Sequence, residues 1–280
     1  MKTSAVLITY NEEQNLSVTL QKLTWCDEII VVDSGSTDDT LLVAKQFGCT
    51  IFKRPFDGYG TQKRFAVAQA KNDWVLCIDA DELLSDGLVK EIKEEMKNPT
   101  ADAYLMPMNL VFMGKEFKYG KESGRHFMRL FNKTKGNFNT NTVHEKIELD
   151  GTTKKLKNLI YHYSYTSFLQ YFDKFNKYST YGAQEGFKKG KTRGMMAVIA
   201  AVPLNFLKYY LVEKNFLNGI SGFNWSVLNA FYHFAKYIKL RELYSVQNIT
   251  RTVPNKPKYS IDGLQHEAGV MQILTVTGIS

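Results

Sequence analysis

One short stretch of the chain carries two carboxylates at a spacing that suits metal and phosphate chemistry. Residues 74–82 read WVLCIDADE, and their five leading apolar residues fit a strand buried on both faces. Residues two apart in an extended chain point the same way, so Asp79 and Asp81 are expected to present their carboxylates together. Two such groups repel unless a cation lies between them, and Mg²⁺ or Mn²⁺ prefers oxygen ligands. A metal–diphosphate clamp and a solvated strand end with an acidic helix cap both fit this stretch.

The preceding residues supply the elements that would position these carboxylates. Strands are expected over residues 5–8, 28–32, 50–52 and 74–78, and helices around 16–23, 37–47, 65–70 and 88–96. Strands that alternate with helices imply right-handed crossovers and a mostly parallel, Rossmann-like sheet. Open α/β sheets bind ligands at the carboxyl ends of their strands, where Asp79 and Asp81 fall.

Two other strand ends in this half carry polar side chains. Residues 9–13 (TYNEE) follow the first strand, and residues 33–40 (DSGSTDDT) follow the second. Ser36 with Asp39 has the spacing of a capping box, which explains these two residues as the start of a helix. Asp33 precedes the turn and has no capping role in this interpretation, so it is a candidate to accept hydrogen bonds from a nucleobase.

Basic residues at 58–64 (GYGTQKR) lie beside a flexible turn ahead of a helix. Lys63 is there a candidate for a nucleotide phosphate, and a solvated helix start is the alternative. The two familiar phosphate loops are missing: no Gly-x-Gly-x-x-Gly follows the first strand, and residues 186–192 are one residue short of a P-loop and follow a helix.

Residues 101–165 change to short strand-like pieces at 103–108, 126–131, 142–147 and 159–163, which predicts an antiparallel extension of the sheet. Loops between these pieces would surround the mouth of the crevice. Arg125 and Arg129, the pair His144-Glu145 in a strand, and His162 between two tyrosines are the chemically notable residues here. A single His or Glu in a strand is more often structural than catalytic.

The last third of the chain is rich in aromatic residues and lysines. Aromatic side chains recur at helical spacing over residues 167–181, with Lys174 and Lys177 on the other side; residues 195–212 are apolar but contain Pro203, Asn205 and Lys208. Such helices suit a segment that lies on an anionic membrane surface. A helical subdomain or a dimer interface is the alternative. Residues 253–280 show little periodicity and are expected to be an extended tail.

The net charge of the chain indicates which classes of molecule it could bind. The 280 residues carry a formal charge of +8, with a pI near 9.1, which favours an acidic partner such as a phosphorylated substrate, anionic lipid or nucleic acid. Nucleic acid is not expected, because clustered carboxylates repel its phosphates when no metal is bound. Three widely separated cysteines and the lack of a signal peptide predict a cytoplasmic protein.

Together these motifs resemble the family 2 glycosyltransferases, which have the GT-A fold. The shared features are TYNEE after the first strand, VVDSGSTD at residues 31–38 and IDADE at 78–82, in the right order and spacing, over roughly residues 3–165. Arg129, residues 143–145 (VHE) and the C-terminal Tyr, Phe and Lys residues look most like lipopolysaccharide-core β-1,4-glucosyltransferases of bacteria. The resemblance implies a catalytic domain at residues 1–165, with a nucleotide-binding half (1–100) and an acceptor half (101–165), a helical membrane-associating region at 166–252 and a tail at 253–280.

The resemblance also implies roles for individual residues. Asp81, as the more direct ligand, Asp79 and His144 would hold Mg²⁺ or Mn²⁺. Family members carry an acidic catalytic base in a later loop or strand, often in a Glu-Asp pair that this chain lacks, so Glu145 is the expected base and Glu122 the reserve. Arg125, Arg129 and His162 are expected near the acceptor or the phosphates. The residues expected to hold the nucleotide are Thr9, Tyr10, Asn11, Glu12, Asp33, Ser34, Lys63, Asp79 and Ala80.

The expected reaction is an inverting sugar transfer. A UDP-sugar is the expected donor, a lipid-linked or lipopolysaccharide-type glycan the acceptor, and the chain could act as a homo-oligomer on the inner membrane face. Two alternatives stay open: a metal-dependent phosphotransferase or phosphohydrolase, and a non-enzymatic basic module that binds membrane or RNA. The former usually places Thr or Val soon after its second Asp, whereas Glu82-Leu83-Leu84 follow here.

Overall fold

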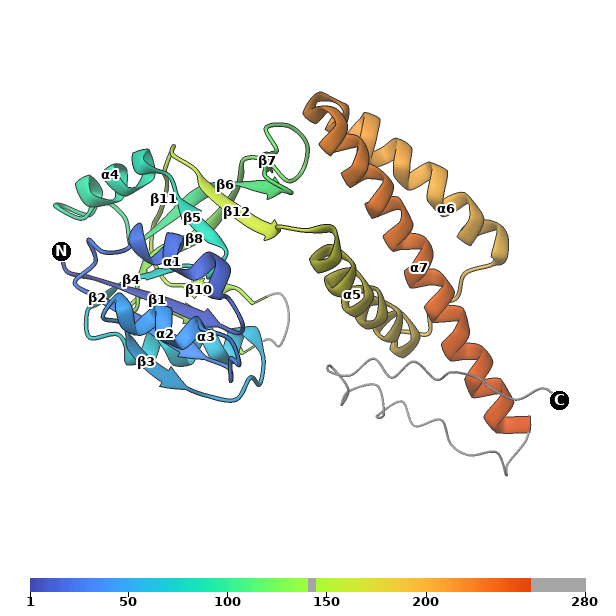
Figure 1. The fold of residues 1–280 in the computed structure, drawn as a ribbon, viewed down its shortest axis with the longest axis horizontal. Helices are drawn as coiled ribbons and strands as arrows, with labels where there is room; N and C mark the ends of the chain where they lie inside the picture. The colour runs from blue at the N-terminus through green and yellow to red at the C-terminus, as the bar shows by residue number, and fades with distance from the viewer. Residues whose placement is uncertain (141–144, 253–280) are drawn as a thin grey trace.

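The computed structural model describes residues 1–140 and 145–252 and shows a sheet with its covering helices beside a separate group of long helices (Figure 1). The strands are β1 (Thr3–Thr9), β2 (Glu28–Asp33), β3 (Thr50–Lys53), β4 (Trp74–Cys77), β5 (Glu82–Leu84), β6 (Ala103–Phe112), β7 (Lys115–Glu116), β8 (Arg125–Asn132), β9 (Gly136–Phe138), β10 (Ile147–Leu149), β11 (Thr153–Lys155) and β12 (Ile160–Tyr165). The helices are α1 (Glu13–Gln21), α2 (Thr40–Gln46), α3 (Tyr59–Gln69), α4 (Asp86–Glu95), α5 (Phe168–Lys188), α6 (Met195–Leu207) and α7 (Gly219–Thr252).

The main sheet has the order β3-β2-β1-β4-β8-β6-β12-β5, and β7 and β11 also pair with β6. Strands β3, β2, β1 and β4 run parallel, and the helices α1, α2 and α3 connect them in chain order. β8 then pairs antiparallel with both β4 and β6. The prediction of a mostly parallel α/β sheet with an antiparallel extension is confirmed.

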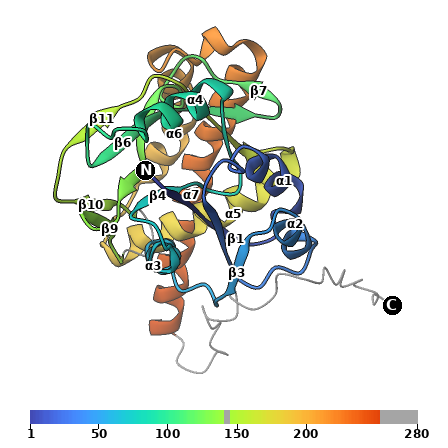
Figure 2. The same ribbon diagram turned by 90° about the vertical axis from the view of Figure 1, so that its left-hand side faces the viewer.

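Alternating side chains of the central strands form two apolar layers. Leu7, Val31 and Leu76 face α1, α2 and α4, whereas Val6 and Val32 face α3. Figure 2 shows α1 and α2 on one side of β1 and α3 on the other. This double burial explains why the strands are almost continuously apolar in sequence, and it fixes which residues reach the carboxyl edge.

Three local predictions need correction. The helix expected from Thr37 begins at Thr40, and Asp39 makes no side-chain cap; instead Asp38 accepts the Thr40 backbone N–H at 3.1 Å. The helix expected near Phe65 already begins at Tyr59, so Lys63 lies inside α3 and not beside a flexible turn. Of the strand expected at 142–147, residues 142–144 lie outside the described part, and Glu145 belongs to no strand.

The C-terminal helices form a second packed unit next to the sheet. α5 and α6 both pack on α7, and Lys239 of α7 reaches across to the Asn176 carbonyl oxygen of α5 at 2.9 Å. An aromatic cluster joins this unit to the end of β6, where Phe112 packs against Tyr171 and Trp225. The chain enters α5 directly after β12, so the carboxyl ends of β1, β2 and β4 face α5 (Figure 1).

Candidate active site

The first two strand ends meet side by side at this edge of the sheet. Thr9 pairs with Asp33 in the parallel register of β1 and β2, and the Thr9 hydroxyl donates to Asp33 Oδ1 at 3.3 Å. Asp33 Oδ2 accepts the backbone N–H groups of Gly35 and Ser36, both at 2.9 Å. The turn needs Gly35 because its φ is +100°, a conformation that side chains disfavour.

Asp33 is fully buried, and its carboxylate stabilises the turn that follows it. The expectation that it has no capping duty is wrong, because its two oxygens accept hydrogen bonds from Gly35, Ser36 and Thr9. Ser36, expected to cap α2, instead donates its hydroxyl to Asp33 and accepts the Asn11 backbone N–H.

The other residues expected to hold the nucleotide line the same edge. Tyr10 is exposed, with 59% of its surface accessible. Asn11 accepts the Thr37 N–H at 2.8 Å, and Ser34 accepts from the Gln62 side chain at 3.1 Å. Burial raises the pKa of Glu12, which accepts from Asn15. The backbone carbonyl of Ala80 accepts a hydrogen bond from the Thr19 hydroxyl of α1 at 2.9 Å.

Asp79 and Asp81 lie in a turn and not in extended chain. β4 ends at Cys77, and the Glu82 N–H donates to the Asp79 carbonyl at 3.0 Å, which closes the turn. The two carboxylates consequently contact different partners. The expectation that they point to one place from an extended strand is wrong for this reason.

Asp79 is held by two cations. Lys63 Nζ lies 2.8 Å from Asp79 Oδ1, and Arg129 Nη2 lies 3.1 Å from Asp79 Oδ2. Lys63 also contacts Glu145 Oε1 at 2.9 Å, and Arg129 also pairs with Glu82. Residues from α3, β5, β8 and the loop before β10 thus form one chain of alternating charges across the carboxyl ends of the sheet.

Within this network, the pKa values of Asp79, Glu82, Lys63 and Arg129 are shifted. Although burial opposes ionisation, Lys63 and Arg129 hold the pKa of Asp79 well below its usual range. Burial raises the pKa of Glu82 despite its pairing with Arg129. The neighbouring carboxylates outweigh burial and raise the pKa of Lys63 and of Arg129. Both basic residues remain cations. Their ion pairs are buried and not surface salt bridges, because the side chains of Lys63 and Arg129 are only 3% and 11% accessible.

Asp81 faces a second set of basic groups. Its Oδ2 lies 3.3 Å from His162 Nε2 of β12 and 4.0 Å from Lys174 Nζ of α5. Burial opposes ionisation here too, but the His162 hydrogen bond and charge lower the pKa of Asp81. The same contact raises the pKa of His162 against the effect of burial.

The residues around Asp81 fit a divalent cation that is shared with a substrate. Among the described residues, no three His, Cys, Asp or Glu side chains gather into a complete metal site, and Asp79 is occupied by Lys63 and Arg129. Asp81 and His162 nevertheless place a carboxylate and an imidazole 3.3 Å apart. Mg²⁺ needs only one or two protein carboxylates when phosphates and water complete its coordination, and imidazole is also a ligand for transition metals. His144 lies outside the described residues.

The remaining expected residues lie at the rim or in the interior. Arg125 is exposed and stacks on the Phe127 ring at 5.2 Å. Glu122 is half-buried, and this burial raises its pKa although Arg125 opposes the shift. Arg129, expected near the acceptor or the phosphates, instead positions Asp79 and Glu82 from the interior.

Two site residues escaped the sequence interpretation. Glu82 is 1% accessible and binds Arg129; its place directly after Asp81 was the available signal. Lys174 was assigned to the outer side of an aromatic helix, because periodicity shows which residues share a face but not which neighbour that face meets.

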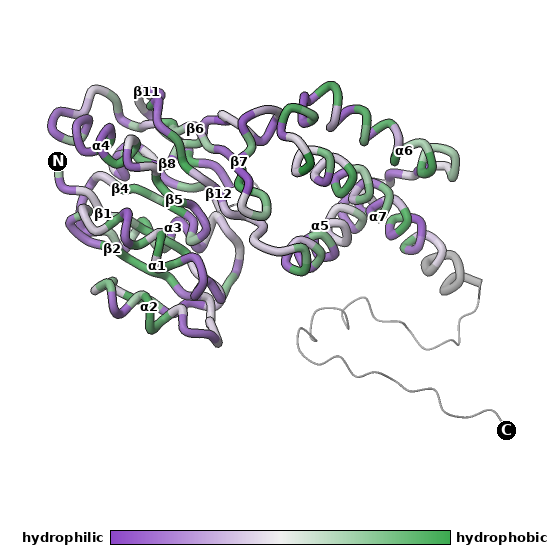
Figure 3. Tube along the Cα trace, turned by 45° about the horizontal axis from the view of Figure 1, so that its top comes forward, coloured by the Kyte–Doolittle hydropathy of each residue, from purple (hydrophilic) through white to green (hydrophobic). Residues whose placement is uncertain are grey.

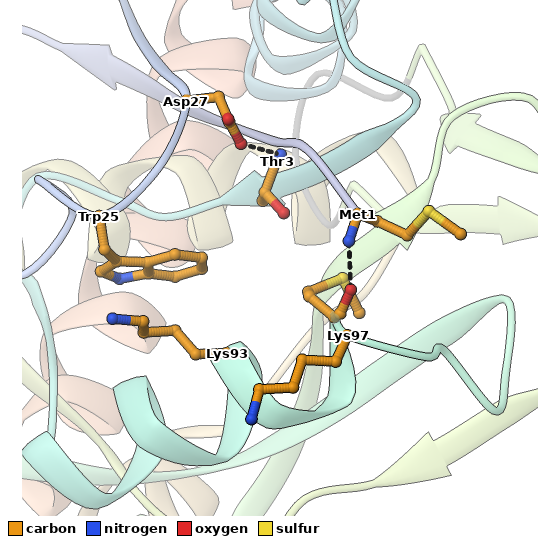
Figure 4. A pocket seen from close by; sticks show the side chains of 7 residues that line it. Met1, Thr3, Trp25, Asp27, Lys93 and Lys97 are labelled. Atoms are coloured by element: carbon orange, nitrogen blue, oxygen red, sulfur yellow. Dashed lines mark hydrogen bonds between the residues drawn. The ribbon is translucent and has the colours of Figure 1, made fainter.

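A cavity of about 240 Å³ lies at the opposite edge of the sheet (Figure 4). It is lined by Met1, Thr3, Trp25, Asp27, Lys93, Met96 and Lys97. Thr3 begins β1 whereas Thr9 ends it. The length of this strand therefore separates the cavity from Asp79 and Asp81, and none of the expected site residues lines it.

Comparison with known proteins shows the family of this chain. The family model described as Glycosyl transferase family 2 matches residues 4–178. An uncharacterized glycosyltransferase of Rickettsia typhi is 36% identical over 259 residues, which cover 86% of this chain and 87% of that protein. The lipopolysaccharide core biosynthesis glycosyltransferase LpsC of Rhizobium meliloti is 29% identical over 253 residues, or 87% and 93% of the two chains. The solved structure of S. aureus TarS 1–349 in complex with UDP-GlcNAc has a TM-score of 0.44 and 18% identity, with 90% and 92% coverage.

Proposed function

The chain belongs to glycosyl transferase family 2, and from this premise we propose that it is an inverting hexosyltransferase with a UDP-sugar donor. Its acceptor is a lipid-linked or lipopolysaccharide-core glycan. The relationship to LpsC supports this class of acceptor. Family membership favours sugar transfer over the phosphohydrolase and the non-enzymatic membrane or RNA module.

One observation carries the proposal: a single ammonium group, that of Lys63, contacts both Asp79 and Glu145. The carboxylate proposed as the base therefore lies beside the strand end that carries Asp79 and Asp81. A base and a leaving-group site must lie on opposite sides of the reacting carbon for inversion, so they must be close but separate.

The residues divide the work of the transfer. Tyr10 and the turn held by Asp33 receive the nucleoside, and Asp81 with His162 would hold Mg²⁺ or Mn²⁺. When bound, the metal stabilises negative charge on the leaving diphosphate. Glu145 accepts the proton of the acceptor hydroxyl as its oxygen attacks the anomeric carbon, and the bond to the diphosphate breaks with its electron pair on the phosphate oxygen.

Two variants separate these roles. We expect Asp81→Asn to lose the Mn²⁺-dependent rise in melting temperature that UDP gives the wild type. Glu145→Gln should keep this rise but lose transfer by roughly 100-fold or more, the usual size of a general-base effect. Thermal shift and release of UDP from UDP-sugars are the two measurements. Normal turnover by Glu145→Gln would place the base elsewhere, and UDP binding that ignores both Mn²⁺ and Asp81→Asn would refute the metal site.

The helical region supports a membrane location. By length and composition, one helical segment among the described residues, Met195–Val212, is apolar enough to cross a membrane, and only 11% of it is buried. α6 is coloured mainly as hydrophobic in Figure 3. Its exposed apolar side chains continue onto α7, which adds Ile220 and Phe223, while Lys208 and Lys214 are exposed nearby. We propose that this apolar face lies on the anionic cytoplasmic face of the membrane and does not span it.

A further inference from the structure

Lys174 comes from outside the sheet and yet reaches the strand end that carries Asp81. Its ammonium lies 4.0 Å from Asp81 Oδ2 and donates to the Ser164 carbonyl oxygen at 2.9 Å. It also lies 5.4 Å from the centre of the Tyr165 ring. The last residues of β12 thus hold the Lys174 side chain in place beside Asp81.

A second contact shows that this face of α5 is turned toward the site. Tyr178 is one helical turn after Lys174, so the two side chains share a face. The Tyr178 side chain lies close to the phenol of Tyr59, the residue that begins α3 one turn before Lys63. α5 therefore approaches the strand ends with the face that carries Lys174 and Tyr178.

The three basic residues around Asp79 and Asp81 differ in what they can still bind. Lys63 and Arg129 each contact two carboxylates and are almost inaccessible. Lys174 is 35% accessible, and its nearest carboxylate lies at the outer limit of an ion pair. An ammonium group has three donor hydrogens, and the structure shows a hydrogen bond for one of them.

We propose that Lys174 binds the donor's diphosphate and so forms, from the helical region, a phosphate subsite opposite Asp81. This inference rests on the proposed sugar transfer. As the bond between the anomeric carbon and the phosphate oxygen breaks, the electron pair stays on that oxygen, and Lys174 keeps its proton and stabilises the added charge. Lys63 was expected to approach the diphosphate, but its ammonium group is paired with Asp79 and Glu145. Lys174 takes its place as the phosphate ligand in this proposal.

Binding of UDP, UMP and uridine to the full chain tests the subsite, measured by calorimetry with saturating Mn²⁺. We expect Lys174→Met to weaken UDP binding by roughly tenfold or more, as for the loss of a charged hydrogen bond, and to leave uridine binding unchanged. Lys174→Arg should restore UDP binding to within about threefold, because it keeps the charge. Lys177→Met is the matched control: Lys177 is exposed on the same helix and should have no effect.

The outcomes separate this inference from the proposed function. Equal UDP affinity of Lys174→Met and wild type would overturn the subsite while the transferase assignment stands. A parallel loss of uridine binding would also overturn it, because the effect would then not come from the phosphates. A wild-type chain that binds no UDP in the presence of Mn²⁺ would refute the proposed donor and the subsite together.

Discussion

Arg129 illustrates how much one buried cation determines in this site. It lies in the interior between Asp79 and Glu82, and Glu82 is nearly inaccessible. A buried ion pair gives little net stability, because desolvation offsets the attraction. Removal of one partner is costly, since it leaves the other charge buried and unpaired. Arg129 is therefore required by the carboxylates around it.

We expect Arg129→Met to lower the free energy of unfolding by about 3 kcal/mol, the usual cost of a broken buried pair. The double variant Arg129→Met with Glu82→Gln should recover part of this loss, because the buried charge on Glu82 is then gone. Urea denaturation of the single and double variants measures both values. Equal stability of Arg129→Met and wild type would show that water replaces the guanidinium.

At the scale of elements, α7 holds the helical region together through a mixture of aromatic and polar contacts. His233 of α7 faces the segment that follows α6. Its Nε2 is 3.0 Å from the Tyr209 hydroxyl of that segment, and its buried Nδ1 has no hydrogen-bond partner. Burial, followed by the charges of Lys236 and Lys208, lowers the pKa of His233 to about 4. The imidazole is therefore neutral in the folded protein at neutral pH.

This shift predicts a loss of stability in mild acid. The unfolded chain binds a proton at His233 near pH 6.5, whereas the folded chain does so only near pH 4. Stability from this residue is thus complete above pH 6.5 and declines as the pH falls toward 4. We expect His233→Asn to reduce the decline in melting temperature over this range. His126→Asn, at an exposed position of β8, should retain the full decline, and identical pH profiles of wild type and His233→Asn would contradict the assignment.

The sequence predicted the parallel sheet because its buried strands leave few alternatives. Residues 29–32 are apolar without interruption, which is typical of a strand that is covered on both faces. The turn at Asp79–Glu82 was not predicted, because it depends on a backbone hydrogen bond that the spacing of acidic residues does not show. The approach of Lys174 depends on how α5 packs against the sheet, which local periodicity also leaves open.

At the scale of the whole molecule, the apolar surface of the helical region is its most unusual property. Large exposed patches of this kind mark interaction surfaces in proteins. On α6, Met196, Ile199 and Leu204 are 78%, 56% and 63% accessible. A bilayer and a second copy of the chain are the two partners that would cover such a face.

We expect the wild type to pellet with vesicles that contain anionic phospholipid, and to be released as salt rises. The double variant Met196→Glu with Ile199→Glu should pellet several-fold less, because it places charge in the apolar face. Leu42→Glu is the control, since Leu42 is 52% accessible on α2 in the other half of the molecule. Unchanged pelleting of the double variant would refute the membrane location. A shift from dimer to monomer in solution would identify the face as a subunit interface instead.

The connection between β12 and α5 consists only of Thr166 and Ser167, and the Ser167 hydroxyl already caps α5 by accepting the Gln170 N–H. So short a link, reinforced by the packing of Phe112 on Trp225, leaves the catalytic half little room to tilt away from the helices. If α6 rests among lipid headgroups, the strand ends that carry Asp79 and Asp81 stay at a set height above them. The enzyme would then select acceptors by length. It would extend a glycan whose end reaches that height, and it would not extend one that ends too near the bilayer or too far from it.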